Sequence, residues 1–268
     1  GVHSCETLQE WEALAELEAE KKLKVRVHHL LPPEEVEAAR ARGIALGKGS
    51  DHLWFGQVKF FADGSLGSGT ALLHEPYTDD PSHGGIACLS PEELRERVEL
   101  AYRYGGDVGV HAIGDLAVTH VLNAIKAARD RFPGPRRDRI EHVQLFHPDD
   151  LPRFRELGVV ASVQPVHLLT DRPVAEKRWG LTRCRYAYAW RSLLRSGIRL
   201  QFGSDAPVEP INPLLGFHAA LTRQNLSGEP SEGWFPDERL RLEEIIHAFT
   251  WVPAWVSRRE NDLGRLGP

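Results

Sequence analysis

Methionine is absent from these 268 residues, cysteine is scarce, and no apolar run is long enough to cross a bilayer. The three cysteines, Cys5, Cys88 and Cys184, are odd in number and far apart, and no CxxC pair occurs. A disulfide framework is therefore not expected, and the spacing favours a reducing, cytoplasmic location. No signal-peptide pattern opens the chain. Because the sequence has no methionine and begins GVHSCETLQEW, we expect a piece of a longer polypeptide.

Strong positive charge is also lacking. The chain carries 33 Lys and Arg against 38 Asp and Glu, with a net charge of −5 and no run rich in Lys or Arg. This balance argues against nucleic acid or an anionic membrane as a partner. No GxGxxG motif follows the first predicted strands, which argues against a dinucleotide-binding fold.

Strand-like and helix-like patterns alternate along the chain at least six times, which predicts a parallel sheet wrapped in helices. The length suits a (β/α)8 TIM-type barrel of about 250 residues, and a doubly wound open sheet is the competing fold. We expect one partial barrel domain over 1–268, with two long irregular loops at 65–90 and 165–185. Strands are predicted at 23–28, 56–64, 107–111, 139–143, 159–166 and 198–205, and helices at 6–22, 32–43, 90–106, 118–125, 147–158, 187–197 and 241–255.

Several of these strands end on residues that can bind a metal or move a proton. The C-terminal ends of barrel strands converge on one face, which carries the active site. Two histidines and a carboxylate would suit an ion such as Zn²⁺. The polar residues at or just beyond strand ends are Lys59, Asp63, His111, Asp115, His142, Gln164, His167 and Asp205.

Each of these residues also has an ordinary structural explanation. Asp115 follows Gly114 and would serve as a helix N-cap, and Asp205 before Ala-Pro would cap a turn. His167 is equally compatible with a rim position and with a substrate contact. Their recurrence at equivalent positions on successive strands nevertheless favours a common site.

Lys59 is the most informative of them because it lies between apolar neighbours in VKFF. Lysine is rarely buried without a partner, so an ion pair with a nearby carboxylate is the ordinary explanation. The functional alternative is that burial lowers the pKa of the amine, which then adds CO2 and becomes a carbamate able to bridge two metal ions.

Five motifs in order resemble the YtcJ-like branch of the amidohydrolase superfamily, also called amidohydrolase family 3. They are VKFFADGSLGSGTALL, VHAIGDLAV, RIEHVQLF, VVASVQPVH and LQFGSDAPVEPINPLLGFHAAL, and the match runs from residue 1 to about residue 267. The resemblance implies a distorted (β/α)8 barrel, one or two divalent metals with zinc as the expected ion, and hydrolysis of C–N bonds other than peptide bonds in small amide-type molecules.

The resemblance also implies residue roles. His111, His142 and Asp205 would be metal ligands, and Lys59 would be the lysine that is carboxylated in many relatives. Asp205 would also be the general base, taking a proton from a metal-activated water and giving it to the leaving nitrogen. Asp63 and His167 are the candidate substrate contacts.

The sequence departs from the family in one major respect. The first strand of the superfamily carries HxH, but no two of the 13 histidines here are separated by one residue. We therefore expect the first strand and the flanking β-sandwich to be missing, since GVHS resembles the end of a second strand and DLGRLGP stops where relatives continue. Gly69 and Leu116 also stand where many relatives have arginine.

Three consequences follow from the missing strand. Metal should bind weakly or not at all, with Lys59 mostly unmodified. The slot between 198–203 and 1–4 should invite pairing, so that the chain self-associates as a homo-oligomer unless another segment fills it. An inactive barrel remnant that acts as a scaffold or binding module is the main alternative function. A barrel lyase or isomerase is disfavoured because its metal-enolate chemistry would need several carboxylate ligands.

Overall fold

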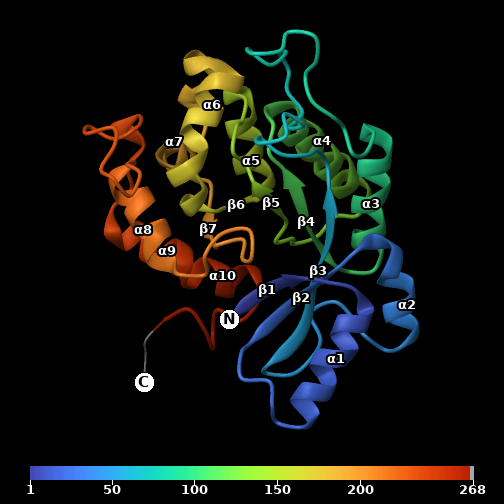
Figure 1. Cartoon of the computed structure of the whole chain (residues 1–268). Helices are drawn as coiled ribbons and strands as arrows, with labels where there is room; N and C mark the ends of the chain where they lie inside the picture. Colours follow the sequence, from blue (N-terminus) through green and yellow to red (C-terminus); the bar gives the residue numbers. More distant parts are fainter. Residues whose placement is uncertain (266–268) are drawn as a thin grey trace.

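The computed structural model describes residues 1–265, so the last residues of DLGRLGP lie outside it. Seven parallel strands form one sheet in the order β1 to β7, and each strand pairs with the next one along the chain. The sheet is an open half-barrel, which confirms the α/β barrel class (Figure 1). The strands are β1 Val2–Cys5, β2 Val27–Leu31, β3 Leu53–Phe61, β4 Asp107–Ala112, β5 Arg139–His142, β6 Val160–Val163 and β7 Leu200–Phe202.

The helices follow the strands around the outside of the sheet (Figure 1). Two of them begin with a capping box, formed by Thr7 with Glu10 in α1 and by Ser90 with Glu93 in α3. The α-helices are α1 Leu8–Ala19, α2 Val36–Ala41, α3 Pro91–Arg103, α4 Asp115–Arg131, α5 Leu151–Leu157, α6 Leu168–Arg183, α7 Trp190–Arg195, α8 Pro213–Thr222, α9 Leu242–Phe249 and α10 Trp251–Val256. No helix among the described residues is both long and apolar enough to cross a membrane.

Three local predictions were wrong. The strand expected at 23–28 begins only at Val27, because 27–31 is fully buried whereas most of 23–26 is exposed. The stretch 165–185 contains the helix α6, whose pattern is broken by Pro173 and by Gly180 at φ +74°. Asp115 is the first helical residue of α4, and Gly114 is the N-cap.

The long segment 65–90 lacks helix and extended strand, as expected. Its Gly69 has a φ of +69°, a conformation that favours glycine, and an added Cβ there would lie 2.9 Å from Nη1 of Arg178. Arg178 donates from Nη2 to the carbonyl oxygen of Gly67 at 3.1 Å. Glycine at this position therefore leaves room for an arginine that reaches across from α6.

Alternation along the strands gives the sheet two different faces. In β3 and β5, Val58, Phe60 and Ile140 belong to the main hydrophobic core beneath the helices. The residues between them include Lys59, Arg139 and Glu141, which line a cavity on the other side of the sheet. The concave face is therefore polar and provides the setting for a chemical site.

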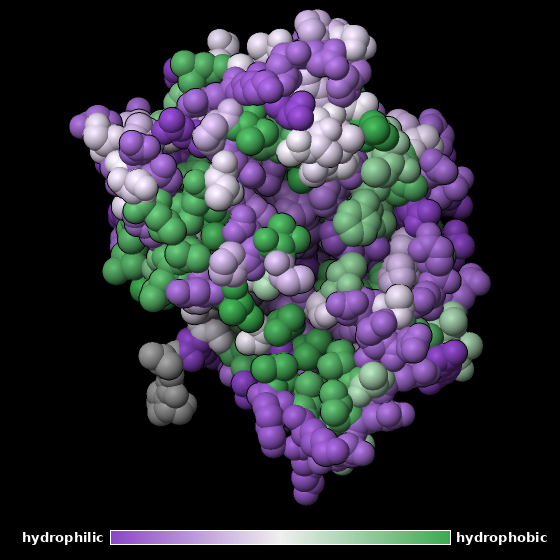
Figure 2. Space-filling model, viewed as in Figure 1, coloured by the Kyte–Doolittle hydropathy of each residue, from purple (hydrophilic) through white to green (hydrophobic). Residues whose placement is uncertain are grey.

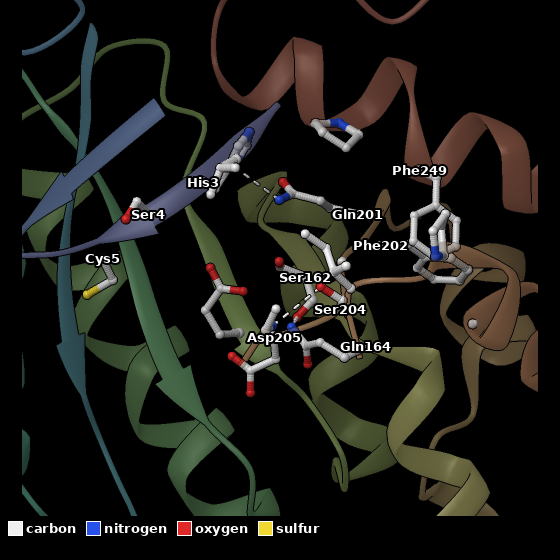
Figure 3. A pocket seen from close by; sticks show the side chains of 18 of the residues that line it. His3, Ser4, Cys5, Ser162, Gln164, Gln201, Phe202, Ser204, Asp205 and Phe249 are labelled. Atoms are coloured by element: carbon white, nitrogen blue, oxygen red, sulfur yellow. Dashed lines mark hydrogen bonds between the residues drawn. The ribbon is translucent and has the colours of Figure 1, made fainter. Parts of the chain in front are cut away.

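The sheet is open between β1 and β7, which have no ladder between them in the part of the chain described. A cavity of about 590 Å³ occupies this region and is lined by residues of both edges. His3 reaches across it: its Nδ1 lies 3.3 Å from Nε2 of Gln201 in β7 (Figure 3) and also contacts Nη1 of Arg139 in β5. The open side of the half-barrel is where a further strand was expected from the sequence.

Candidate metal centre

Three side chains that follow three successive strands converge at one end of the cavity. His142 ends β5, His167 lies in the short 3-10 turn Pro165–His167 after β6, and Asp205 follows β7. One nitrogen of each imidazole and one oxygen of the carboxylate lie within 4.8 Å of one another. In Figure 3, Asp205 and Gln164 lie together, away from His3 and Gln201. This donor set is one that a divalent ion such as zinc accepts.

Two of these side chains are placed at the site by unusual backbone conformations. His142 and Asp205 have φ values of +76° and +59°, which are uncommon for residues other than glycine. Val143 continues the left-handed turn after β5, at φ +43°. Such conformations cost about 1–3 kcal/mol each and cluster at functional sites, which supports a functional reason for the turn.

Gln164 orients the first of the two imidazoles. Its Oε1 lies 2.9 Å from Nδ1 of His142, while its Nε2 donates to the carbonyl oxygen of Ser162 at 3.4 Å. The second contact fixes which end of the amide faces the histidine, so Nδ1–H is the donor and the lone pair of His142 Nε2 remains free. Burial, reinforced by the nearby His111 and Lys59, holds the pKa of His142 well below its usual 6.5. His142 is therefore a neutral imidazole, the form that binds metals.

His167 lies between two carboxylates and is 7% exposed. Its Nε2 is 3.6 Å from Oδ2 of Asp205, and its Nδ1 is 3.8 Å from Oε1 of Glu209. The Nε2 atom is buried and has no hydrogen-bond partner among the described residues. A buried nitrogen without a partner is costly unless something binds it, so this atom fits a metal ligand.

His111 lies beside this group rather than within it. Its ring centroid is 4.5 Å from that of His142, but its Nε2 contacts the carbonyl oxygen of Gly64 at 2.9 Å and lies 3.5 Å from Oδ1 of Asp63. Burial and the charge of Lys59 lower the pKa of His111 to about 4. One nitrogen of the ring is thus engaged by the loop after β3, and only Nδ1 is left for another partner.

Asp63 is enclosed by backbone groups. It accepts hydrogen bonds from the N–H groups of Leu72, Ile113 and Gly114 at 2.8–3.0 Å, and its side chain is fully buried. Burial raises its pKa to about 7 despite these donors. The contacts tie the start of the 65–90 loop to the end of β4, so in this structure Asp63 supports the loop and His111.

Lys59 is buried without an ion pair in the described part of the chain. Its side chain points toward the cavity, its Nζ lies 4.5 Å from the ring centroid of Phe61, and burial lowers the pKa of the amine. The nearby carboxylate of Glu141 is engaged instead by Nε of Arg139 at 2.5 Å. The ordinary explanation for a buried lysine, a carboxylate partner, is therefore not met here.

Sequence reasoning did not identify Arg139, Glu141 or Glu209 as site residues. Arg139 and Glu141 alternate with the buried Ile140, and charged residues at alternate positions of a core strand are a readable signal of a polar interior face. Glu209 follows Asp205 by four residues in a loop, where spacing alone indicates nothing.

Comparisons with known proteins match the chain to one family. The model of the family described as "Amidohydrolase family" matches residues 1–268. The putative amidohydrolase YtcJ of Bacillus subtilis is 37% identical over 212 residues, which is 79% of this chain and 40% of that protein. The N-substituted formamide deformylase of Arthrobacter pascens is 24% identical over 79% of this chain and 38% of that protein.

A solved structure shares the fold over the whole chain. The crystal structure of an uncharacterized metal-dependent hydrolase from Pyrococcus horikoshii OT3 is 34% identical, with a TM-score of 0.85. It is matched over 100% of this chain and 53% of its own. The chain thus spans about 40% of the curated relatives and about half of this solved chain.

Proposed function

The chain belongs to the amidohydrolase family, and on that premise we propose that it forms the catalytic barrel of a metal-dependent hydrolase. The reaction would be hydrolysis of C–N bonds other than peptide bonds in small, amide-type substrates. The observation that carries this proposal is the convergence of His142, His167 and Asp205 within 4.8 Å at the ends of three successive strands.

The donor set favours zinc. Two neutral imidazoles and one carboxylate would hold the ion, which when bound would polarise the scissile carbonyl and lower the pKa of a bound water toward about 7. His111 would serve as a further ligand only through Nδ1, since its Nε2 contacts Gly64. Lys59 would remain a free amine unless two ions were present to retain a carbamate on it.

This chain's own residues would move the proton. Asp205 would take a proton from the attacking water and deliver it to the leaving nitrogen, so that an amine departs rather than an amide anion. Gln164 would keep His142 in one tautomer through the contact at 2.9 Å. The polar concave face, with Lys59 and Arg139, would then surround the substrate's carbonyl end.

The cavity and the family support a small, amide-type substrate. A volume of about 590 Å³ is in the range that accommodates a small molecule. In Figure 2, hydrophilic residues line the hollow near the centre of this face, and hydrophobic residues lie around it. An N-substituted formamide, the substrate class in the name of the Arthrobacter relative, is therefore a reasoned first probe.

The test combines metal binding with turnover. Metal-depleted chain is titrated with ZnCl₂ by calorimetry and assayed on N-substituted formamides, alongside Asp205→Asn and His142→Ala. We expect zinc binding in the parent chain, weakened by about 10-fold or more in both variants, and unchanged in His83→Ala, whose exposed histidine is not among the three residues of the cluster. Equal zinc binding by the parent and Asp205→Asn would overturn the site. Zinc binding with no turnover of any amide probe would favour a scaffold or binding module.

A further inference from the structure

The loop after β7 turns back on itself and presents two carboxylates to one histidine. Val208 N–H donates to the carbonyl oxygen of Asp205 at 2.8 Å, which closes a turn. Val208 then points outward, 70% exposed, while the side chain of Glu209 returns to the protein and is only 20% exposed. Asp205 and Glu209 therefore reach His167 from the same loop.

The two carboxylates face different nitrogens of the ring. Oδ2 of Asp205 is 3.6 Å from Nε2, and Oε1 of Glu209 is 3.8 Å from Nδ1. His167 itself is nearly buried, and its backbone sits in the 3-10 turn between Gln164 and α6. Its ring can satisfy both carboxylates only in a narrow range of orientations.

From this arrangement we infer that Glu209 is a positioning residue for His167. With the site occupied, Glu209 would accept Nδ1–H, which would direct the lone pair of Nε2 toward the space shared with His142 and Asp205. Carboxylate–histidine contacts of this kind fix the tautomer and the ring orientation of a ligand and raise its basicity. Both distances exceed a hydrogen bond, and a contact of this kind tightens when the site is occupied.

The inference rests on the proposed function in one respect, namely that His167 binds the ion. It assigns His167 to the metal side of the site rather than to substrate contact. It also gives Glu209, a residue that sequence spacing did not single out, a defined task.

The first measurement is zinc affinity, by competition with a chromogenic chelator, in the whole 268-residue chain. Glu209→Ala is expected to bind zinc about 10–100-fold more weakly than the parent. Glu209→Gln keeps an oxygen acceptor for Nδ1–H and is expected to lose less. Glu232→Ala, which removes an exposed carboxylate from another loop, is the matched control and should bind like the parent.

The second measurement is the ¹⁵N chemical shift of the His167 ring nitrogens in metal-free protein, at a pH where imidazole is neutral, about 8.5. Glu209→Ala should shift the tautomer balance toward Nε2–H, because Asp205 is then the remaining acceptor, and Asp205→Asn should shift it the opposite way. A purely structural role for Glu209 would not produce these opposite shifts.

The two readouts separate the possible failures. If the parent chain binds no zinc, the proposed function fails, and the tautomer shifts still decide the role of Glu209. If the parent binds zinc but Glu209→Ala has unchanged affinity and unchanged ring shifts, the role assigned to Glu209 is wrong.

Discussion

At the scale of single residues, Lys59 shows how burial changes the chemistry of a side chain. The amine is buried, and of the two carboxylates whose charge reaches it, Glu141 is paired with Arg139 and Asp205 makes no ion pair with it in the described part of the chain. Its contact with the ring of Phe61 at 4.5 Å returns about 0.5–1 kcal/mol, less than the cost of burying a charged donor without a partner. Burial of Lys59 therefore costs the folded chain more free energy than the contact with Phe61 contributes.

We expect Lys59→Met to raise the free energy of unfolding by about 1–2 kcal/mol near neutral pH. The pKa of Lys59 is lower in the folded state than its ordinary 10.5, so between those two values the unfolded chain binds more protons. The free energy of unfolding of the parent therefore rises as pH rises through this window. The difference in this free energy between Lys59→Met and the parent becomes smaller there.

Urea denaturation at several pH values measures this effect. Lys48→Met, at an exposed position, is the matched control and should leave the midpoint nearly unchanged. A loss of stability in Lys59→Met would mean that the amine has a favourable partner.

The site was partly predictable from sequence at this scale. Histidine and aspartate at strand ends could be recognised because barrel geometry gathers such ends, and the structure does bring His142, His167 and Asp205 together. The metal assignments for Lys59, His111, His142 and Asp205 remain predictions. Contacts that depend on loop conformation, such as Glu209 with His167 and Asp63 with three backbone N–H groups, have no pattern in the sequence.

At the scale of elements, α7 and α9 are joined by a bidentate ion pair. Nη1 and Nη2 of Arg191 donate to Oε1 and Oε2 of Glu244 at 2.6 and 2.7 Å, and both side chains are less than one-fifth exposed. Together with Arg241, Arg191 lowers the pKa of Glu244 to about 2. Paired geometry of this kind is stronger than a single surface contact.

Glu244→Gln should therefore lower the free energy of unfolding by about 1–2 kcal/mol at neutral pH. Because the pKa is about 2 folded and about 4.5 unfolded, this stabilisation is full above pH 4.5 and is lost as pH falls toward 2. Thermal melts of parent and variant should therefore converge across that acidic window.

Glu243→Gln, in which an exposed carboxylate of the same helix is changed, is the control and should cost much less. A difference between parent and Glu244→Gln that persists unchanged at pH 2 would contradict the assignment of the effect to this charge.

Helices were predicted well where apolar residues recur at helical spacing, and poorly where a proline or a glycine interrupts the helix. The helices predicted from residues 6 and 90 begin at Leu8 and Pro91, directly after the capping residues Thr7 and Ser90. Helix α6 was not predicted because Pro173 lies in its first turns and Gly180 interrupts it. Burial of Trp179 in the hydrophobic core nevertheless stabilises the helix. Tertiary packing overrides local propensity there.

At the scale of the whole molecule, the open edges of the sheet should govern association. Val2 and Glu6 donate their N–H groups to Arg26 and Leu30 of the β2 side at 2.8 and 3.2 Å. Since donors alternate along a strand, the N–H groups of His3 and Cys5 face the open side. An unpaired edge of this kind is a template for pairing with another chain.

We expect the chain to self-associate in a concentration-dependent way, and Cys5→Pro to reduce this because proline removes an outward N–H donor. Light scattering after size-exclusion, under reducing conditions, measures the mass. Cys5→Ala controls for loss of the thiol and should associate like the parent. A parent chain that stays monomeric at every concentration would show that the open edges of the sheet do not pair with another chain.

The order of the strands carries a consequence for biosynthesis. Every pairing in the sheet joins strands that are neighbours in the chain, so each unit can dock on the previous one as it leaves the ribosome. A nascent chain that has emerged through β5 already holds His142 but lacks the two donors that follow β6 and β7. Competence to bind a metal should therefore arise late in translation, only after the loop that carries Asp205 and Glu209 has emerged.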